Sequence, residues 1–371
     1  MKNLKKIDLV FKNISNTIIL IIAVSILSII MLNLYRGLNL FVFFQESEYL
    51  DKLQNYSEFE WTNQYFIDQD KLTASYISYL GHIEDSLDTK TIKVSSNGVR
   101  NSFNNSDNSE VVFLGGSAMF GFGSNDEFTI PSLFAKYTNM TVKNNGNAGH
   151  TSFQGYLKLL NHTRHYRNTS LIISYDGVNE VYNLNSYKRE KHSYEDLFNS
   201  RISSSRINSM NSKEYSIVNY LIGFVEPLIS VTTKVIAKIS KKNSTKTFEY
   251  TEKDIDNIAL NLLSNWSLML DEARKLDIKF YAVLQPVAKY GDPSTYHLPI
   301  SQDVLKFYKS LYDKVRLTLN TNYEYQDLKN SFIDLSDIFQ GEKFIFYDHV
   351  HVSPNGNEEI TSYLIDRLNI N

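Results

Sequence analysis

Hydrophobic residues are most concentrated near the N-terminus of the chain, where residues 13–35 contain no charged side chain. An apolar run of this length is enough for a helix to cross the ~30 Å hydrocarbon layer of a membrane. Four lysines precede the run, namely Lys2, Lys5, Lys6 and Lys12. The positive-inside rule therefore predicts a cytoplasmic tail over residues 1–12 and a transmembrane helix over 13–35. It places the rest of the chain outside the cytoplasm, in the periplasm or at the cell surface.

A cleaved signal peptide is the alternative interpretation of this segment. Signal peptides have apolar regions of ~7–15 residues that end in small residues at a cleavage site. The run here is longer and ends in Met31, Asn33, Tyr35 and Arg36. A single-span membrane anchor is therefore the favoured interpretation.

The segment that follows, residues 36–105, mixes aromatic and polar side chains and ends in a stretch rich in Asn and Ser. This composition predicts a juxtamembrane stalk, partly helical, that leads through a polar loop into a folded domain.

From residue 106 to residue 371, short apolar runs alternate with longer stretches of helical period. Buried strands are predicted at 111–115, 140–144, 170–175 and 278–285. Apolar residues recur every three or four positions over 255–273 and 304–315, which predicts amphipathic helices. The alternation predicts a three-layer α/β/α sandwich around a mostly parallel sheet.

One segment, at about 184–250, interrupts this alternation. It is first polar and rich in serine, then apolar, with no clear strand. Glu226 and Pro227 break the apolar part, and the uncharged run before them, 215–225, is too short to cross a membrane. The segment is interpreted as a helical insertion, either a cap over a site or a membrane-surface contact.

Charge and cysteine content exclude several classes of function. The formal net charge is only -3 and the chain has no basic block, so nucleic acid is not expected as a partner. The chain has no cysteine, which excludes disulfides, thiolate zinc sites and a cysteine nucleophile.

Glycines and small polar residues follow each of the first three predicted strands. In a parallel sheet, ligand sites lie outside the carboxyl ends of the strands. Ser117 comes directly after the first strand, Gly149 lies in the loop after the second, and Asn179 follows the third. Such sequences are common in plain turns. Their shared position nevertheless makes Ser117 a candidate nucleophile, with the N–H groups of Ser117 and Gly149 and the amide of Asn179 as oxyanion donors.

A base and its orienting acid are available near the C-terminus. Asp348 and His351 are three residues apart, so the carboxylate can reach the imidazole within one turn of backbone. Ser353 and Pro354 are typical of the N-cap and first position of a helix, which would hold that turn. The three side chains Ser117, His351 and Asp348 would then form a catalytic triad.

The other histidines near these segments have competing interpretations. His349 is a less favoured base, because its neighbouring position directs it away from the pair. His162 and His165 could share a helix face, but no third metal ligand is evident and no metal site is predicted. His150 and Gly116 are possible substrate-binding residues.

The order of these segments resembles that of the SGNH hydrolases, the GDSL esterase and lipase family, whose four blocks carry Ser, Gly, Asn and His. The stretches GGSAMFG, NNGNAG, GVNE and DHVH are similar to these blocks, and SSNGVR is similar to the lead-in of bacterial membrane-anchored members. The resemblance covers roughly residues 93–368. It implies an SGNH/flavodoxin-like fold and the roles assigned above. Gly116 and Glu180 stand where the family usually has Asp.

The function implied by this resemblance is that of a serine esterase without a cofactor. Its expected partners are the membrane and an acylated carbohydrate or other ester, such as O-acetyl groups of cell-surface or exported polysaccharide. An O-acetyltransferase on the same substrates and a catalytically silent glycan-binding assembly factor are the alternatives. An α/β-hydrolase nucleophile elbow is disfavoured, because Met119 stands where its second glycine would be.

Overall fold

The computed structural model describes residues 56–78, 80–106, 109–162, 168–181, 250–289, 302–339 and 345–370, together with five residues between 24 and 31. The chain divides into two compact units, Met1–Asn63 and Gln64–Asn371. Among the described residues, no helix has the length and apolarity needed to cross a membrane. The predicted transmembrane helix at 13–35 and the predicted insertion at 184–250 lie almost entirely outside these residues, so both stay predictions.

The first unit contributes few described residues. Those between 24 and 31 are helical, and the Ser28 hydroxyl donates to the Val24 carbonyl at 2.8 Å. Farther along, the Thr62 hydroxyl donates to the Phe59 carbonyl at 2.7 Å, where helix α2 (Thr62–Gln69) begins.

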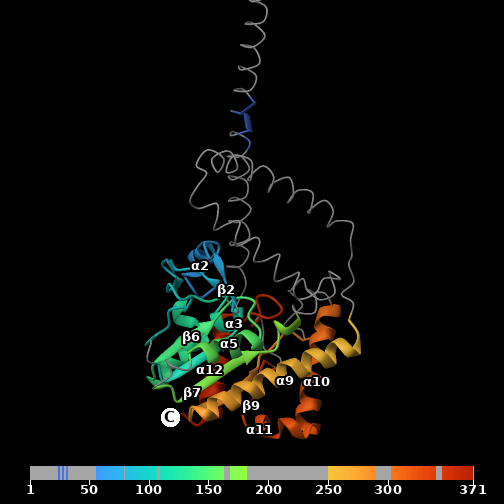
Figure 1. The fold of residues 1–371 in the computed structure, drawn as a ribbon. Coiled ribbons are helices and arrows are strands. Elements are labelled where there is room, and N and C mark those ends of the chain that lie inside the picture. Colours follow the sequence, from blue (N-terminus) through green and yellow to red (C-terminus); the bar gives the residue numbers. More distant parts are fainter. Residues whose placement is uncertain are drawn as a thin grey trace, which may run out of the picture. The chain divides into compact units, whose positions relative to one another are not determined.

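The second unit is built on a sheet of five parallel strands in the spatial order β6-β5-β7-β8-β9 (Figure 1). The strands are β5 (Val111–Gly115), β6 (Val142–Gly146), β7 (Leu171–Asp176), β8 (Lys279–Leu284) and β9 (Phe332–Asp334). The parallel sheet and its first four strands were predicted from the sequence, with β6 beginning two residues later than expected. The short edge strand β9 was not predicted.

Helices cover both faces of this sheet, as the predicted three-layer sandwich requires. The bounds are α3 (Ser117–Phe120), α4 (Ile130–Thr138), α5 (Ser152–His162), α9 (Glu252–Lys275), α10 (Gln302–Thr321), α11 (Gln326–Lys329) and α12 (Pro354–Leu368). Short 3-10 turns occupy Asp126–Phe128 and Tyr323–Tyr325. The long helix α9 starts at a capping box formed by Thr251 and Asp254, which satisfies its first backbone N–H groups.

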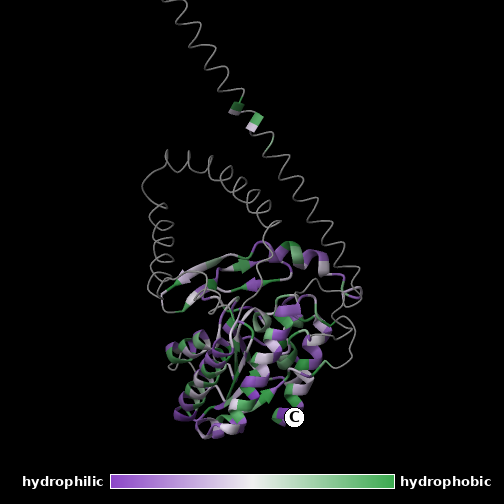
Figure 2. Cartoon of the chain, turned by 90° about the vertical axis from the view of Figure 1, so that its right-hand side faces the viewer, coloured by the Kyte–Doolittle hydropathy of each residue, from purple (hydrophilic) through white to green (hydrophobic). Residues whose placement is uncertain are grey.

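Strand side chains alternate between two hydrophobic cores. Val112 and Leu114 of β5 pack with α5, α9 and α10, whereas Val111 and Phe113 pack with α4 and α12. Both faces of the strand are buried, which explains why it reads as a continuous apolar run. In Figure 2 the helices around the sheet carry hydrophobic and hydrophilic residues on different faces, as amphipathic helices do.

The segment before the sheet is not a stalk from Gln64 onward. It forms two antiparallel pairs, β1 (Ala74–Ile77) with β2 (Gly81–Glu84) and β3 (Leu87–Asp88) with β4 (Lys93–Val94). We call residues 64–105 the lead-in segment. It belongs to the same compact unit as the sheet, and its Arg100 is completely buried. Residues on both sides of the predicted boundary at 106 thus lie in one compact unit, in which buried polar side chains of the lead-in segment bond to the loops that follow β5 and β6.

Candidate active site

The candidate site lies where the strand order reverses. From β5 the chain continues to β6 on one side, and β7, β8 and β9 follow on the other side. In doubly wound sheets this switch point leaves a crevice outside the carboxyl ends of the strands, where ligands bind. Ser117 begins α3 directly after β5, and Asn179 follows β7, so the two predicted residues stand on either side of this position.

Ser117, His351 and Asp348 form a continuous hydrogen-bonded chain. His351 Nε2 lies 2.7 Å from Ser117 Oγ, and His351 Nδ1 lies 2.6 Å from Asp348 Oδ2. All three side chains are partly exposed to solvent. With Asp348 accepting the proton of Nδ1, Nε2 is free to accept the hydroxyl proton of Ser117. The geometry brings together the three predicted triad residues, although the serine and the base are 234 positions apart.

A tight turn holds the acid in its ionised form. Asp348 Oδ1 accepts the backbone N–H groups of Val350 at 2.8 Å and His351 at 2.7 Å. Burial alone would raise the pKa of Asp348, but the hydrogen bond and charge of His351, together with these two N–H groups, hold that pKa below its usual value. Ser353 caps α12 through the Gly356 N–H, as predicted, and fixes the end of the turn.

Two aromatic rings stack against the base. The His351 ring lies 5.5 Å from Tyr347 and 5.6 Å from Phe122, measured between centroids, with interplanar angles of 18° and 28°. Phe122 comes from the loop after α3, so the loop that follows the nucleophile also limits how the imidazole can rotate. Neither ring could be singled out from the sequence, because neither carries chemistry of its own.

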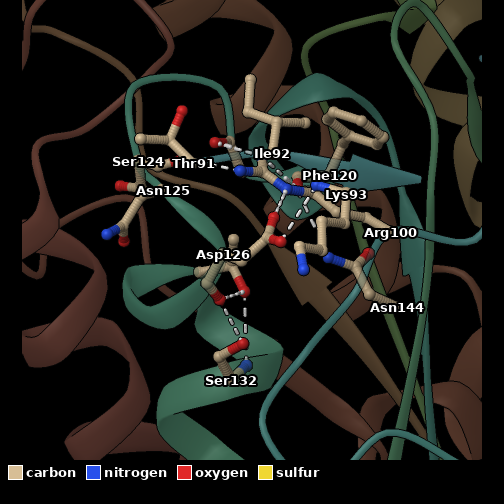
Figure 3. A network of polar contacts seen from close by, with 12 residues as sticks. Thr91, Ile92, Lys93, Arg100, Phe120, Ser124, Asn125, Asp126, Ser132 and Asn144 are labelled. Atoms are coloured by element: carbon tan, nitrogen blue, oxygen red, sulfur yellow. Dashed lines mark hydrogen bonds and ion pairs between the residues drawn. The ribbon is translucent and has the colours of Figure 1, made fainter. Parts of the chain in front are cut away.

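Arg100 of the lead-in segment holds the loop after α3 (Figure 3). Its guanidinium donates to the carbonyls of Phe120, Gly121 and Ser124 at 2.7–3.0 Å, and its Nε pairs with Asp126 Oδ1 at 3.0 Å. The planar guanidinium also lies 5.0 Å from the centroid of the Phe120 ring. The sequence offered no signal for this role, since the partners are 20 or more residues away and three of them are backbone carbonyls.

Of the three predicted oxyanion donors, Ser117 follows β5, while Gly149 and Asn179 come from the loops after β6 and β7. Asn179 Nδ2 donates to the His150 carbonyl at 2.7 Å, and its second N–H makes no hydrogen bond to another described residue. A Cβ on Gly116 would overlap this amide nitrogen, so glycine before the nucleophile is what lets Asn179 approach. Gly149 is exposed and has φ +72°, a conformation that glycine adopts without strain.

The structure corrects the prediction for two residues. His150, expected as a substrate contact, is buried with its Nε2 2.6 Å from the carbonyl of His82. Burial and the nearby Lys158 lower its pKa to about 3, so the ring is neutral. Gly116 is likewise buried, and its role is the close approach of Asn179. The physical reason in both cases is packing against elements distant in the sequence.

Glu180, at one of the positions that depart from the family pattern, has a structural role. Its carboxylate accepts the backbone N–H groups of Ser152 at 2.7 Å and Gly177 at 3.2 Å, and so joins the start of α5 to the loop after β7. Burial raises the pKa of both Glu180 and the neighbouring Asp176, and the charge of Glu180 raises that of Asp176 further. The pair supports the loop that carries Asn179.

His349, the less favoured base, does not enter the triad. The His349 ring packs on Tyr308 of α10 at 6.0 Å between centroids, which leaves His351 as the base. The side chain of His162 and all of His165 lie outside the described residues. Across the parts of the chain that the structure describes, no group of three or more His, Asp or Glu residues could hold a metal ion.

The chain is similar to known proteins in its structure, and no similarity was found at the level of sequence. No protein-family model matches the chain, and no curated protein matches its sequence. Similar solved structures include an acetyl xylan esterase (13% identity, 70% of this chain, 98% of the other, TM-score 0.39). A GDSL-like lipase from Bacteroides thetaiotaomicron is also similar (15% identity, 70% of this chain, 87% of the other, TM-score 0.36). So is a lipase from a goat rumen metagenome (12% identity, 69% of this chain, 95% of the other, TM-score 0.38). The chemical roles proposed for this chain rest on the side chains described above.

Proposed function

We propose that the chain is a serine esterase of SGNH type. The observation that carries this proposal is the relay from Asp348 through His351 to Ser117, with both hydrogen bonds at 2.6–2.7 Å. A hydroxyl hydrogen-bonded to an imidazole, itself oriented by an ionised carboxylate, is the arrangement that activates serine for attack on an ester carbonyl.

The reaction proceeds by acyl transfer through the serine. Ser117 Oγ attacks the ester carbonyl while His351 Nε2 takes its proton, and Asp348 stabilises the imidazolium that forms. The negative charge on the carbonyl oxygen is bound by the N–H groups of Ser117 and Gly149 and by the amide of Asn179. His351 then protonates the departing alcohol, which leaves an acyl-serine. A water molecule, deprotonated by His351, releases the carboxylic acid and restores Ser117.

The proposed physiological substrate is an O-acyl group, in particular acetyl, on cell-surface or exported polysaccharide. Support for this comes from the sequence: the uncharged segment 13–35 with lysines before it suits an anchor that presents the second unit outside the cytoplasm. A membrane-tethered esterase meets substrates close to the membrane surface. Transfer of the same acyl group to a sugar hydroxyl instead of water would make the protein an O-acetyltransferase.

Hydrolysis of p-nitrophenyl acetate by the purified chain tests the proposal. We expect turnover in the wild type, covalent labelling of Ser117 by a fluorophosphonate, and loss of both in Ser117→Ala with the thermal unfolding temperature retained. Turnover and labelling that persist in Ser117→Ala would show that another residue is the nucleophile. Wild-type protein that neither turns over nor labels would favour the silent assembly factor. Product analysis with an acetylated glycan then separates free acetate from transferred acetyl.

A further inference from the structure

Strand β2 of the lead-in segment lies against the loop that carries Gly149. Glu84, the last residue of β2, is buried and accepts the Ala148 N–H through Oε1 at 2.6 Å. Its other oxygen accepts a hydrogen bond from the side-chain amide of Asn147. The carbonyl of His82, on the same strand, is bonded to His150. The residues on both sides of Gly149 are therefore held by β2.

Gly149 itself has few contacts that could fix its position. It is exposed, and a Cβ built on it would meet no atom within 4 Å. Its N–H can keep a constant place relative to Ser117 only if the neighbouring residues are held. The bonds from Glu84 to Ala148 and Asn147 supply this on the N-terminal side of Gly149.

Asn147 connects this anchor to the rest of the site. Its amide nitrogen also donates to the Gly98 carbonyl at 3.2 Å, and its amide oxygen accepts from the ammonium group of Lys158 on α5. Its backbone N–H donates to the carbonyl of Gly115 at 3.1 Å, at the end of the strand that leads to Ser117. The oxyanion loop and the nucleophile strand are thus joined at Asn147.

Two buried ionisable side chains, one acidic and one basic, flank the Asn147 side chain. Glu84 and Lys158 are each at most 5% exposed. Burial lowers the pKa of Lys158 to about 7, and the negative charge of Glu84 opposes this effect. Removing a charge from water is costly unless hydrogen bonds and an opposite charge compensate it. Moving Glu84 or Lys158 would break the hydrogen bonds that compensate their burial. The two side chains therefore support the loop rigidly.

We propose that Glu84 is a positioning residue for the oxyanion hole, which through Ala148 and Asn147 sets the place of the Gly149 N–H relative to Ser117. The proposal rests on the proposed esterase function. Glu84 acts through the loop, so its contribution is realised when negative charge develops on the substrate oxygen. Its loss should lower kcat while leaving KM nearly unchanged.

The test compares Glu84→Gln with Asp85→Asn, which removes the same charge from the next residue. Active sites are first titrated with a fluorophosphonate, so that kcat refers to folded enzyme only. With p-nitrophenyl acetate we expect Glu84→Gln to lower kcat per titrated site by about 10- to 100-fold, with KM within about twofold of wild type. Asp85→Asn should match wild type in both constants.

A thionoester of the same alcohol shows whether the oxyanion hole is the part affected. Sulfur accepts hydrogen bonds poorly, so an intact hole favours the oxygen ester strongly. We expect the ester-to-thionoester rate ratio to fall in Glu84→Gln and to stay constant in Asp85→Asn. An unchanged kcat, or a lowered kcat with an unchanged ratio, would overturn the proposal.

The experiment also distinguishes a variant that fails to fold from a failure of the esterase function itself. If Glu84→Gln does not fold, Glu84→Asp, which keeps the charge and shortens the side chain by one methylene, is judged by the same two criteria. If wild-type protein neither labels nor turns over, the esterase function itself fails. If the wild type is active and the Glu84 variant is equally active, the positioning role is overturned and the esterase function is not.

Discussion

The side-chain amide of Asn179 lies in the space that a Cβ on Gly116 would occupy. The same Cβ would also lie 3.1 Å from the carbonyl of His150, which already accepts a hydrogen bond from Asn179. One missing side chain therefore allows the loops after β5, β6 and β7 to meet beside the nucleophile.

Gly116→Ala is expected to lower kcat for p-nitrophenyl acetate on the order of 100-fold, since the methyl group must displace the Asn179 amide. Gly155→Ala is the matched control: in α5 a Cβ at Gly155 meets its nearest atoms at 3.7 Å, an ordinary contact. The control should keep its activity and gain up to ~1 kcal/mol of stability from helix propensity. Equal activity of the two variants would contradict the assigned place of Asn179.

Asp348→Asn should reduce kcat by about 10³- to 10⁴-fold. An amide at this position can stabilise the wrong tautomer of His351 and cannot compensate the charge of the imidazolium. Asp337→Asn, which removes a carboxylate paired with Lys289 on the surface, is the control for loss of one negative charge. Steady-state kinetics on both variants, with circular dichroism to confirm folding, checks this prediction. A small effect of Asp348→Asn would mean that another group orients the base.

Arg100→Met is expected to destabilise the second unit by about 3–5 kcal/mol, because Asp126 loses its buried ion-pair partner and three backbone carbonyls each lose one buried donor. Denaturant unfolding of this variant, of Asp126→Asn and of the double variant forms a double-mutant cycle. The double variant should lose less stability than the sum of the two single losses. Additive losses would indicate that the ion pair contributes little beyond the carbonyl bonds.

The buried His150 predicts loss of stability in acid. Its pKa is about 3 in the folded protein and near 6.5 in an exposed histidine. Between these values the unfolded chain binds a proton that the folded chain does not, so stability is fully present above about pH 6.5 and falls as the pH is lowered toward 3. This group contributes a slope of at most ~1.4 kcal/mol per pH unit.

Free energies of unfolding at pH 7.0, 5.5 and 4.5 measure this slope. His150→Gln keeps a donor for the His82 carbonyl but does not titrate, so its stability should depend less on pH than that of the wild type. Parallel curves for the two proteins would show that His150 is protonated in the folded state.

The sequence was sufficient to predict the central strands and to single out Ser117, Asp348 and His351, because both leave local patterns. Strands buried on both faces read as apolar runs, and Asp348 and His351 are close enough in sequence to be recognised as a pair. β9 escaped notice because only three residues at the sheet edge are paired, within a polar stretch. The lead-in segment was misjudged for a different reason. Arg100 and Glu84 are buried by bonds to backbone groups far away in the chain, and an isolated charged residue in a polar stretch is usually exposed.

The same long-range contacts explain the error at His150. A histidine next to a loop glycine near a predicted site is a reasonable substrate contact as long as the loop is open on that side. The β1–β2 hairpin closes that side, and no turn signal in residues 74–84 indicated where the hairpin would dock. Membrane anchoring and the polysaccharide substrate stay predictions.

The distance of 2.7 Å between Ser117 and His351 also bears on biosynthesis. The nucleophile and its loop are made early, but the base and the acid that activate it come just before the last helix, α12. In the proposed esterase, the growing chain therefore carries Ser117 before the base that would activate it has been made. Catalytic competence would arise only when Asp348 and His351 dock beside α3, so the appearance of ester hydrolysis would report docking of the C-terminal part of the second unit.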